Sequence, residues 1–304
     1  MSETEKISLR YQGIDIWPDP EIAQTLWEGQ IGAIASVRGA LNAIARAAQA
    51  ISSQLLQFSG RLVYVGAGSA GLLAMQEGME MNPTFGWPLN RTLFLMAGGD
   101  GARLSPSGHH EDDGISGHEK IISEKILGDD VVIGVSASGN TNYTVAATES
   151  AARHNNLTIG ISNNRTGKLL EIVDHPIFLD SGCEVIAGST RMNAGTAQKA
   201  ALNILSSMTM IHMGHVVDGM MVNLTVDNKK LHERATTIVS RISNIDGDHA
   251  SDLLESVNGS VKAAVLLAMG LNSEDAVTLL KKHHGFLRKA MGEISNSSTY
   301  KKRL

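Results

Sequence analysis

The spacing of apolar residues changes near residue 60. Before it, apolar positions recur every three to five residues from Pro20 to Phe58, which predicts a helical segment. After it, short apolar runs rich in β-branched residues alternate with helical stretches. These runs are RLVYVG (61–66), RTLFLMAGG (91–99), DDVVIGVSAS (129–138), LTIGISNN (157–164) and HPIFLDSG (175–182). Near-continuous apolar strands are typical of a mainly parallel sheet, so a three-layer α/β fold is expected.

The last part of the pattern is helical again. A long helix is predicted from about Ser189 to His215, and no strands are expected from Asn228 onward. The chain therefore divides into an N-terminal helical segment (1–58), a central α/β domain (59–225) and a small C-terminal helical module (226–304).

Two histidines stand one turn apart near the end of the long helix, in the sequence HMGH. His212 and His215 could form a metal pair, but the sequence offers no third ligand nearby. We therefore interpret them as helix-end histidines.

Composition narrows the class of protein. The net charge is −5 and no basic cluster occurs, which argues against nucleic acid as a partner. The apolar runs are shorter than a membrane span and MSETEKISLR lacks the apolar core of a signal peptide, so a cytoplasmic protein is expected. The single cysteine, Cys183, excludes an internal disulfide and reads as a small loop residue. Abundant glycine and only 4% aromatic residues suit loops that bind small polar ligands.

The sequence RLVYVGAGSAG reads as strand, tight loop and helix, an arrangement that aims backbone N–H groups at an anion. Gly66, Gly68 and Gly71 also satisfy the dinucleotide pattern G-x-G-x-x-G. That fingerprint requires an acidic residue at the end of the second strand, roughly 20 positions later. Here Asp100 comes late, behind two glycines, and the dinucleotide interpretation is weakened.

A second loop of the same kind follows the strand VVIGV. In SASGNT, the hydroxyls of Ser136, Ser138 and Thr141 accompany the backbone amides of Gly139 and Asn140 at a predicted helix N-terminus. An ordinary helix cap needs only one such hydroxyl. The two additional hydroxyls predict a phosphate cradle, a loop that binds a phosphomonoester without a metal or a lysine. No Walker lysine follows either loop, which argues against a nucleoside triphosphate.

Longer motifs carry a family resemblance. GAGSAG, EMNPTFG, AGGD, HEDD, ASGNTNY and GSTRMNAGTAQKAALN resemble the pattern of the N-acetylmuramic acid 6-phosphate etherase family, from about residue 30 to 291. The resemblance implies a sugar isomerase (SIS) fold with a C-terminal helical module. It also implies a homodimer in which a neighbour's loop completes the pocket. The related glucokinase regulatory protein shares this architecture and binds sugar phosphates without chemistry.

The resemblance also implies a reaction. The family cleaves the D-lactyl ether at C3 of the sugar, giving N-acetylglucosamine 6-phosphate and D-lactate in peptidoglycan recycling, without a metal or redox cofactor. Its general acid falls on Glu80 and its base on Glu111. In the ring-opened sugar the C2 proton lies beside the C1 aldehyde, so a carboxylate removes it while lactate leaves, and water then adds. The two pKa values must differ; burial would raise that of Glu80, and Asp112 and Asp113 stand beside Glu111.

The implied substrate contacts come from both loops and from the start of the long helix. They are Gly68, Ser69, Ser136, Ser138, Gly139, Asn140, Thr141, Glu184, Ser189, Thr190, Arg191 and Lys199. Glu184 is a candidate for orienting substrate, while Lys199 fits a structural salt bridge nearly as well as an anion contact.

The motifs depart from the family pattern within the two loops. Ala70 and Leu72 replace a serine and an arginine, while Asn140 and Asn142 replace an arginine and a proline. A good charge-assisted hydrogen bond is worth roughly 1.5–3 kcal/mol, so the loss of two arginines affects how anionic groups are held. Two alternatives therefore stay open, a sugar-phosphate-binding regulator without turnover and a SIS-type aldose–ketose isomerase. An enzyme that transfers hydride is the function that the sequence favours least.

Overall fold

The computed structural model describes residues 3–99, 101 and 108–296, which form two compact units. The sheet unit contains the chain up to Met79 together with Leu89–Thr209. The helical unit contains Glu80–Pro88 together with the described chain from Met210 onward. The three-part division expected from the sequence stays a prediction.

The sheet has the five strands that the apolar runs predict, all parallel, in the order β2-β1-β3-β4-β5. Their bounds are β1 Leu62–Gly66, β2 Thr92–Met96, β3 Val131–Ser136, β4 Leu157–Ser162 and β5 His175–Phe178. Every residue of β1 and β3 is buried. This explains why these strands read as continuous apolar runs rather than as alternating ones.

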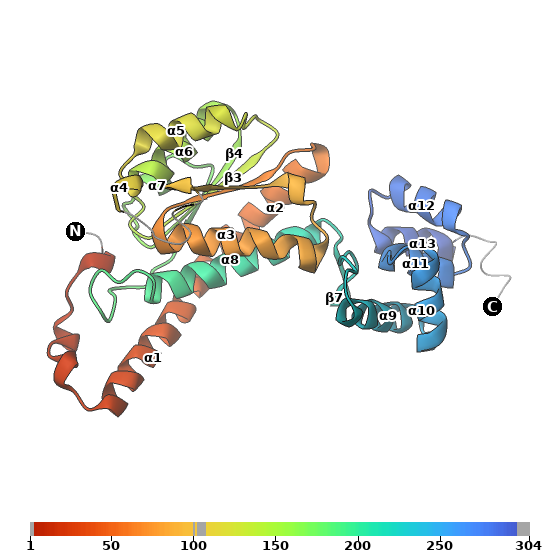
Figure 1. Ribbon diagram of the computed structural model, residues 1–304, viewed down its shortest axis with the longest axis horizontal. Coiled ribbons are helices and arrows are strands. Elements are labelled where there is room, and N and C mark those ends of the chain that lie inside the picture. The colour runs from red at the N-terminus through yellow and green to blue at the C-terminus, as the bar shows by residue number, and fades with distance from the viewer. Residues whose placement is uncertain (1–2, 100, 102–107, 297–304) are drawn as a thin grey trace. The chain divides into compact units, whose positions relative to one another are not determined.

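Helices cover both faces of the sheet, with α5 and α6 on one side and α3 and α8 on the other (Figure 1). The helices that lie in this unit or begin in it are α1 Asp19–Ser36, α2 Leu41–Gln57, α3 Gly68–Phe85, α4 Gly108–Glu111, α5 Gly114–Ser123, α6 Asn142–Arg153, α7 Lys168–Glu171 and α8 Asn193–His212. The α/β fold expected from the sequence is confirmed. The predicted helical segment before residue 58 is divided by a 3₁₀ turn, Val37–Ala40. Further 3₁₀ turns are Glu3–Glu5, Leu9–Tyr11, Ile14–Ile16 and Leu89–Arg91.

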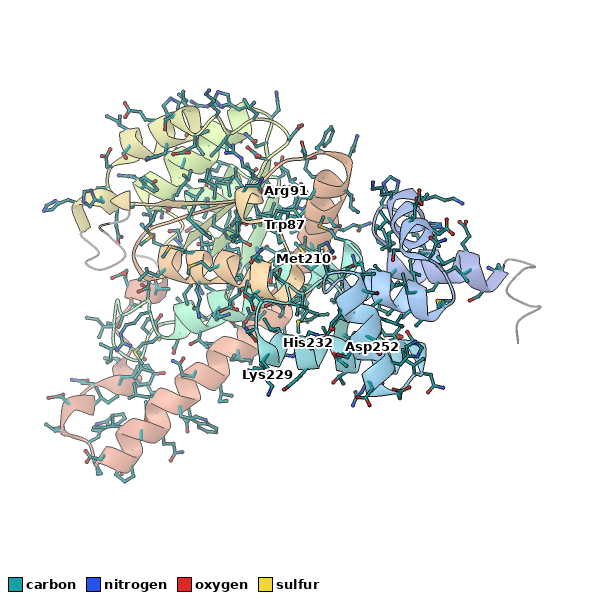
Figure 2. The ribbon with its side chains drawn as sticks, turned by 45° about the vertical axis from the view of Figure 1, so that its right-hand side comes forward. Trp87, Arg91, Met210, Lys229, His232 and Asp252 are labelled. Carbon is teal, nitrogen blue, oxygen red and sulfur yellow. The ribbon has the colours of Figure 1, made fainter. Side chains whose placement is uncertain are left out.

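The helical unit begins with a small hairpin that the sequence pattern did not predict, β6 Val216–Val217 and β7 Met220–Met221. The stretch that follows is helical, as expected, and has five helices among the described residues: α9 Lys229–Ser243, α10 Gly247–Ser256, α11 Val261–Ala268, α12 Ser273–Lys282 and α13 Leu287–Asn296. They enclose one apolar core around Val239, Leu254 and Leu266. Trp87, from the segment 80–88, and Met210 are also buried; both are labelled in Figure 2.

Side chains cap four helix N-termini in the helical unit. Asn228, Asp246, Ser260 and Asn272 each accept the backbone N–H three residues later. Such caps satisfy N–H groups that the helix itself leaves unpaired. They explain why this stretch breaks into short helices at its Asn, Asp and Ser residues.

Among the described helices, no single one is long and apolar enough to cross a membrane. The pair Val261–Ala268 and Ser273–Lys282 meets the same criterion only when both helices are taken together, with a bend of 116° between them.

Candidate active site

The strand order reverses between β1 and β3. The chain leaves β1 to form β2 on one side, and β3 then pairs with the other side of β1, Gly66 lying opposite Val135. In open α/β sheets ligands bind outside the carboxyl ends of the strands at such a reversal. The two loops that the sequence singles out, GAGSAG and SASGNT, leave the carboxyl ends of these two strands. The structure therefore brings them to one edge of the sheet.

The glycine loop is shaped by close approaches. A Cβ on Gly66 would lie 2.5 Å from the Cα of Gly71, so strand β1 and helix α3 pack at the distance that glycine allows. Gly68 has φ +52°, and a Cβ there would lie 2.7 Å from Oε1 of Glu111. Ser69 follows in the first turn of α3. The carboxylate of Glu111 thus lies against the start of α3.

Glu111 ends the short helix α4 and is half-buried. Burial raises the pKa of its carboxyl above the usual range for glutamate, and the negative charge of Asp112 raises it further. A carboxylate with a raised pKa holds a proton more strongly, which suits a general base.

The second loop is held by its own hydroxyl groups. Ser136 Oγ accepts the N–H of Gly139 at 3.0 Å and lies 2.8 Å from Thr141 Oγ1. Ser138 Oγ accepts the N–H of Asn140 at 3.1 Å. These bonds within the loop fix its conformation next to the start of α6, where an anion is expected to bind.

The last residue of β4 and the residues that follow it contact this loop. Gly139 has φ +69°, and a Cβ there would lie 2.7 Å from Ser162 Oγ and 2.8 Å from the Cα of Gly167. The side-chain amide of Asn164 donates to the carbonyl of Ser138 at 3.0 Å. Sequence reasoning missed Ser162 and Asn164; the available signal was the polar sequence SNN at the end of a buried strand.

Glu184 caps the long helix α8. Its side chain is 1% exposed, and its two oxygens accept the N–H groups of Asn193 at 2.8 Å and Ala194 at 2.9 Å. Burial raises the pKa of Glu184, an effect that these two bonds oppose. The sequence predicted a helix start at about Ser189, but α8 begins at Asn193, where this cap supplies acceptors for the N–H groups of the first turn.

We expect Glu184→Ala to destabilise the sheet unit by about 1–3 kcal/mol, because two buried N–H groups lose their acceptors. Urea unfolding followed by circular dichroism measures this change. Glu119→Ala, at an exposed position on α5, is the control and should shift the free energy of unfolding by no more than about 0.5 kcal/mol. A Glu184 variant as stable as the control would contradict the capping role.

The turn before α8 contains Ser189 and Thr190, and the carbonyl of Thr190 accepts the N–H of Gly195 at 2.9 Å. Arg191 is exposed and lines, with Lys199, a cavity of about 350 Å³. Its remaining lining residues are Ile34, Leu73, Gly195, Thr196, Ala200 and Asn203. The structure thus places the two predicted anion contacts, Arg191 and Lys199, in one cavity.

Lys199 also makes the salt bridge that the sequence left open. Its ammonium lies 3.2 Å from Oε2 of Glu77, which is 4% exposed. Asn203 and Ser206 donate to the same carboxylate, Ser206 at 2.5 Å. Glu77, which sequence reasoning missed, ties α3 to α8.

Glu80 lies one turn beyond Glu77 on α3, within the helical unit. Its side chain is exposed, so the burial that the apolar sequence around it suggested was wrong. The apolar residues around it, Met81 and Phe85, turn inward instead and are buried. Asp100 lies outside the described residues.

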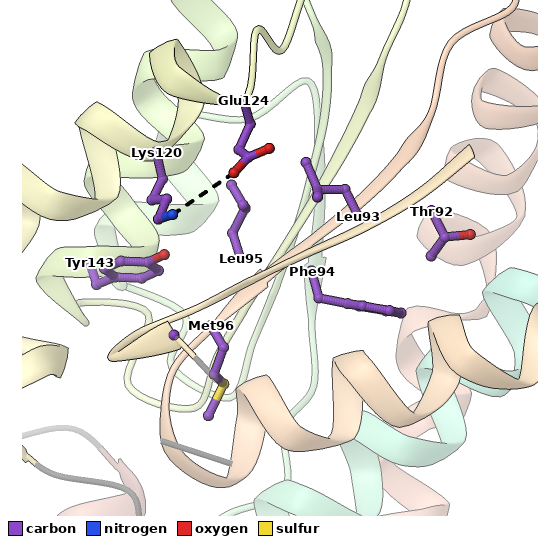
Figure 3. A pocket seen from close by; sticks show the side chains of 9 residues that line it. Thr92, Leu93, Phe94, Leu95, Met96, Lys120, Glu124 and Tyr143 are labelled. Carbon is purple, nitrogen blue, oxygen red and sulfur yellow. Dashed lines mark ion pairs between the residues drawn. The ribbon is translucent and has the colours of Figure 1, made fainter. Parts of the chain in front are cut away.

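A different cavity, of about 340 Å³, runs along the open edge of β2 (Figure 3). Lys120 of α5 and Glu124, just beyond the end of that helix, line one side of it and form an ion pair at 3.8 Å, and Tyr143 lies beside them. It contains none of the predicted site residues. The loops at the ends of β1 and β3 therefore remain the candidate site.

Comparison with known proteins gives one consistent group. Residues 43–152 match the family model described as the glucokinase regulatory protein N-terminal SIS domain. The chain is 39% identical over 291 residues to N-acetylmuramic acid 6-phosphate etherase of Deinococcus radiodurans, covering 95% of each protein. It is 34% identical over 286 residues to the protein of the same name from Francisella philomiragia, covering 94% of this chain and 97% of the relative.

Among solved structures, the chain resembles a protein from Bacteroides fragilis described as a phosphosugar isomerase involved in capsule formation. The TM-score is 0.52 at 22% identity, over 66% of this chain and 95% of the other. This likeness shows the SIS fold that the motifs implied.

Proposed function

Because the chain belongs to the N-acetylmuramic acid 6-phosphate etherase family, we propose that it cleaves the D-lactyl ether of N-acetylmuramic acid 6-phosphate. The products are N-acetylglucosamine 6-phosphate and D-lactate, and the reaction belongs to peptidoglycan recycling in the cytoplasm. The observation that carries this proposal is the 39% identity across 95% of both chains, which includes the sheet unit and the helical unit alike.

In this proposal the SASGNT loop binds the 6-phosphate. The N-terminus of α6 and the loop amides supply positive potential, and Ser136, Ser138 and Thr141 supply hydroxyl donors. Each of these hydroxyls can turn its proton from its present partner toward a phosphate oxygen. Gly68, Ser69, Ser189, Thr190 and Arg191 complete the substrate contacts. Glu184 and Lys199 act by holding α8 in place.

Glu111 is the proposed base and Glu80 the proposed acid. In the ring-opened sugar, Glu111 takes the C2 proton, the C2–C3 double bond forms and the C3–O bond breaks. Glu80 gives a proton to the departing lactate oxygen. Water then returns a hydroxyl to C3 and a proton to C2. The burial that raises the pKa of Glu111 supports its role as the base.

The deciding experiment measures D-lactate release from N-acetylmuramic acid 6-phosphate in ¹⁸O-labelled water, with mass analysis of the sugar. We expect lactate release and one ¹⁸O at C3. Tight binding without lactate would favour a regulator, an option that the replaced loop arginines at Leu72 and Asn140 keep open. Formation of a ketose would identify an isomerase. Light scattering on the same sample gives the molar mass in solution and so tests the proposed homodimer.

We expect Asp112→Asn to shift the acid limb of the pH–rate profile to lower pH. The negative charge of Asp112 raises the pKa of Glu111, and a base works only above its own pKa, so removing that charge extends activity into more acidic solution. The pH dependence of kcat/KM measures the shift. Asp129→Asn, at an exposed position before β3, is the control. An acid limb that stays in place or moves upward would exclude Glu111 as the titrating base.

We expect Ser138→Ala to weaken binding of N-acetylglucosamine 6-phosphate about tenfold, the effect of roughly 1.4 kcal/mol for one hydrogen bond to a charged group. Isothermal titration calorimetry gives the affinity. Ser123→Ala, on the exposed end of α5, should leave it unchanged. Equal affinity of wild type and Ser138→Ala would reject the phosphate cradle.

A further inference from the structure

The end of helix α3 is short of its own hydrogen bonds. Pro83 lies inside the helix and has no N–H, so the helix cannot bond the carbonyl of Met79 in the usual way. Gly86, with φ +62°, ends the helix, and its N–H donates to the carbonyl of Asn82 at 2.8 Å. The last carbonyl of the helix, that of Phe85, needs donors from elsewhere.

Two side chains supply those donors. Asn223 donates from Nδ2 to the Phe85 carbonyl at 2.9 Å, and Nδ1 of His215 lies 2.6 Å from the same oxygen. Burial lowers the pKa of His215 to about 4, so its ring is neutral near pH 7. A carbonyl only accepts, and Nδ1 of His215 therefore carries the ring proton.

These two residues are fixed by the hairpin between them. His215 immediately precedes β6, and Asn223 follows β7 by two positions. The N–H of Val222 donates to the carbonyl of His215 at 3.0 Å, which closes the base of the hairpin. A Cβ on Gly86 would lie 2.0 Å from the carbonyl oxygen of Asn223, so helix end and hairpin base are in direct contact. All of these residues belong to the helical unit.

We propose that His215 and Asn223 are positioning residues that hold the last turns of α3 and thereby place Glu80 for its role as the acid. The inference rests on the proposed function. Glu80 stands five residues before Phe85 on the same helix, so a shift of the helix end moves its carboxyl. A misplacement of about 1 Å can cost roughly 10²-fold in rate. The proposal gives a role to His215 and to the hairpin, which are not among the proposed substrate contacts.

The test combines hydrogen exchange with kinetics. In Asn223→Ala and His215→Leu, amide exchange of residues 80–86 should rise at least about tenfold, as expected when roughly 1.4 kcal/mol of local stability is lost. For D-lactate release, kcat should fall about 10- to 100-fold while KM stays within about threefold, because substrate binding is kept and placement of the acid is lost.

Two further variants sharpen the result. His215→Asn can place an amide N–H near the former Nδ1 and should restore most of kcat, whereas His249→Asn, on the exposed start of α10, should change nothing. If His215→Leu fails to fold, Asn223→Ala decides. Unchanged exchange, or raised exchange with wild-type kcat, would overturn the inference. A wild-type chain that releases no lactate would instead contradict the proposed function, and exchange alone would then decide whether the helix end is held.

Discussion

Glu111→Gln should reduce the kcat of D-lactate release by roughly 10²–10⁴-fold, the loss expected when a general base is removed. The amide has nearly the same size as the carboxyl, so the contact with Gly68 is kept. It cannot take up the C2 proton. In D₂O the wild type should place deuterium at C2 of the sugar product, and the variant should also lose exchange at this carbon.

The control for this prediction stands next to it in the chain. Asp112→Asn removes an exposed charge from the same acidic sequence and should keep wild-type kcat at the optimum pH. If Asp112→Asn lost as much turnover as Glu111→Gln, general disturbance of the acidic segment would explain both results. Wild-type C2 exchange in Glu111→Gln would show that another group is the base.

Glu80→Gln should lower kcat by a similar factor, roughly 10²–10⁴-fold, without a change in stability. Glu80 is exposed and its side chain contributes little to packing. Loss of an acid matters less when the leaving group needs no proton, so an ether with a more acidic leaving group should recover much of the rate. Comparison of the two substrates by stopped assay measures this recovery.

Glu77→Gln, one helical turn away, is the matched control with the opposite expectation. Glu77 is buried and accepts hydrogen bonds from Lys199, Asn203 and Ser206. An amide at this position leaves a cation without its partner, and we expect a loss of about 1–3 kcal/mol in the free energy of unfolding. If Glu80→Gln destabilised the chain as Glu77→Gln does, and kept its kcat, Glu80 would be a structural residue.

The sheet could be predicted from the sequence because its central strands are buried on both faces and their apolar runs are continuous. The two-residue strands of the hairpin at Val216–Met221 are too short to produce such a pattern. The substrate loops could be predicted because their residues are neighbours in the chain. The partners of Glu77 lie more than 120 residues away, as Lys199 and Asn203 illustrate, and no local pattern shows them.

Glu80 and Glu184 show the same limit for single side chains. Both carboxyls stand in apolar sequence, yet one is exposed and the other is buried as a helix cap. Which side of α3 faces the core depends on packing with distant elements. The burial of Glu184 depends on a turn that brings it back to the start of α8, nine residues later.

Asn140 is more than the loss of an arginine from the family pattern. Its side-chain oxygen accepts the N–H of Lys168, the first residue of α7, at 2.9 Å. A guanidinium only donates and cannot make this bond. Restoring arginine here would add a cation for the phosphate and, at the same time, release the start of α7 from the loop. Asparagine at this position therefore pre-orders the loop without adding a positive charge, so the affinity of the wild type for phosphosugar should depend less on ionic strength than that of an Asn140→Arg variant.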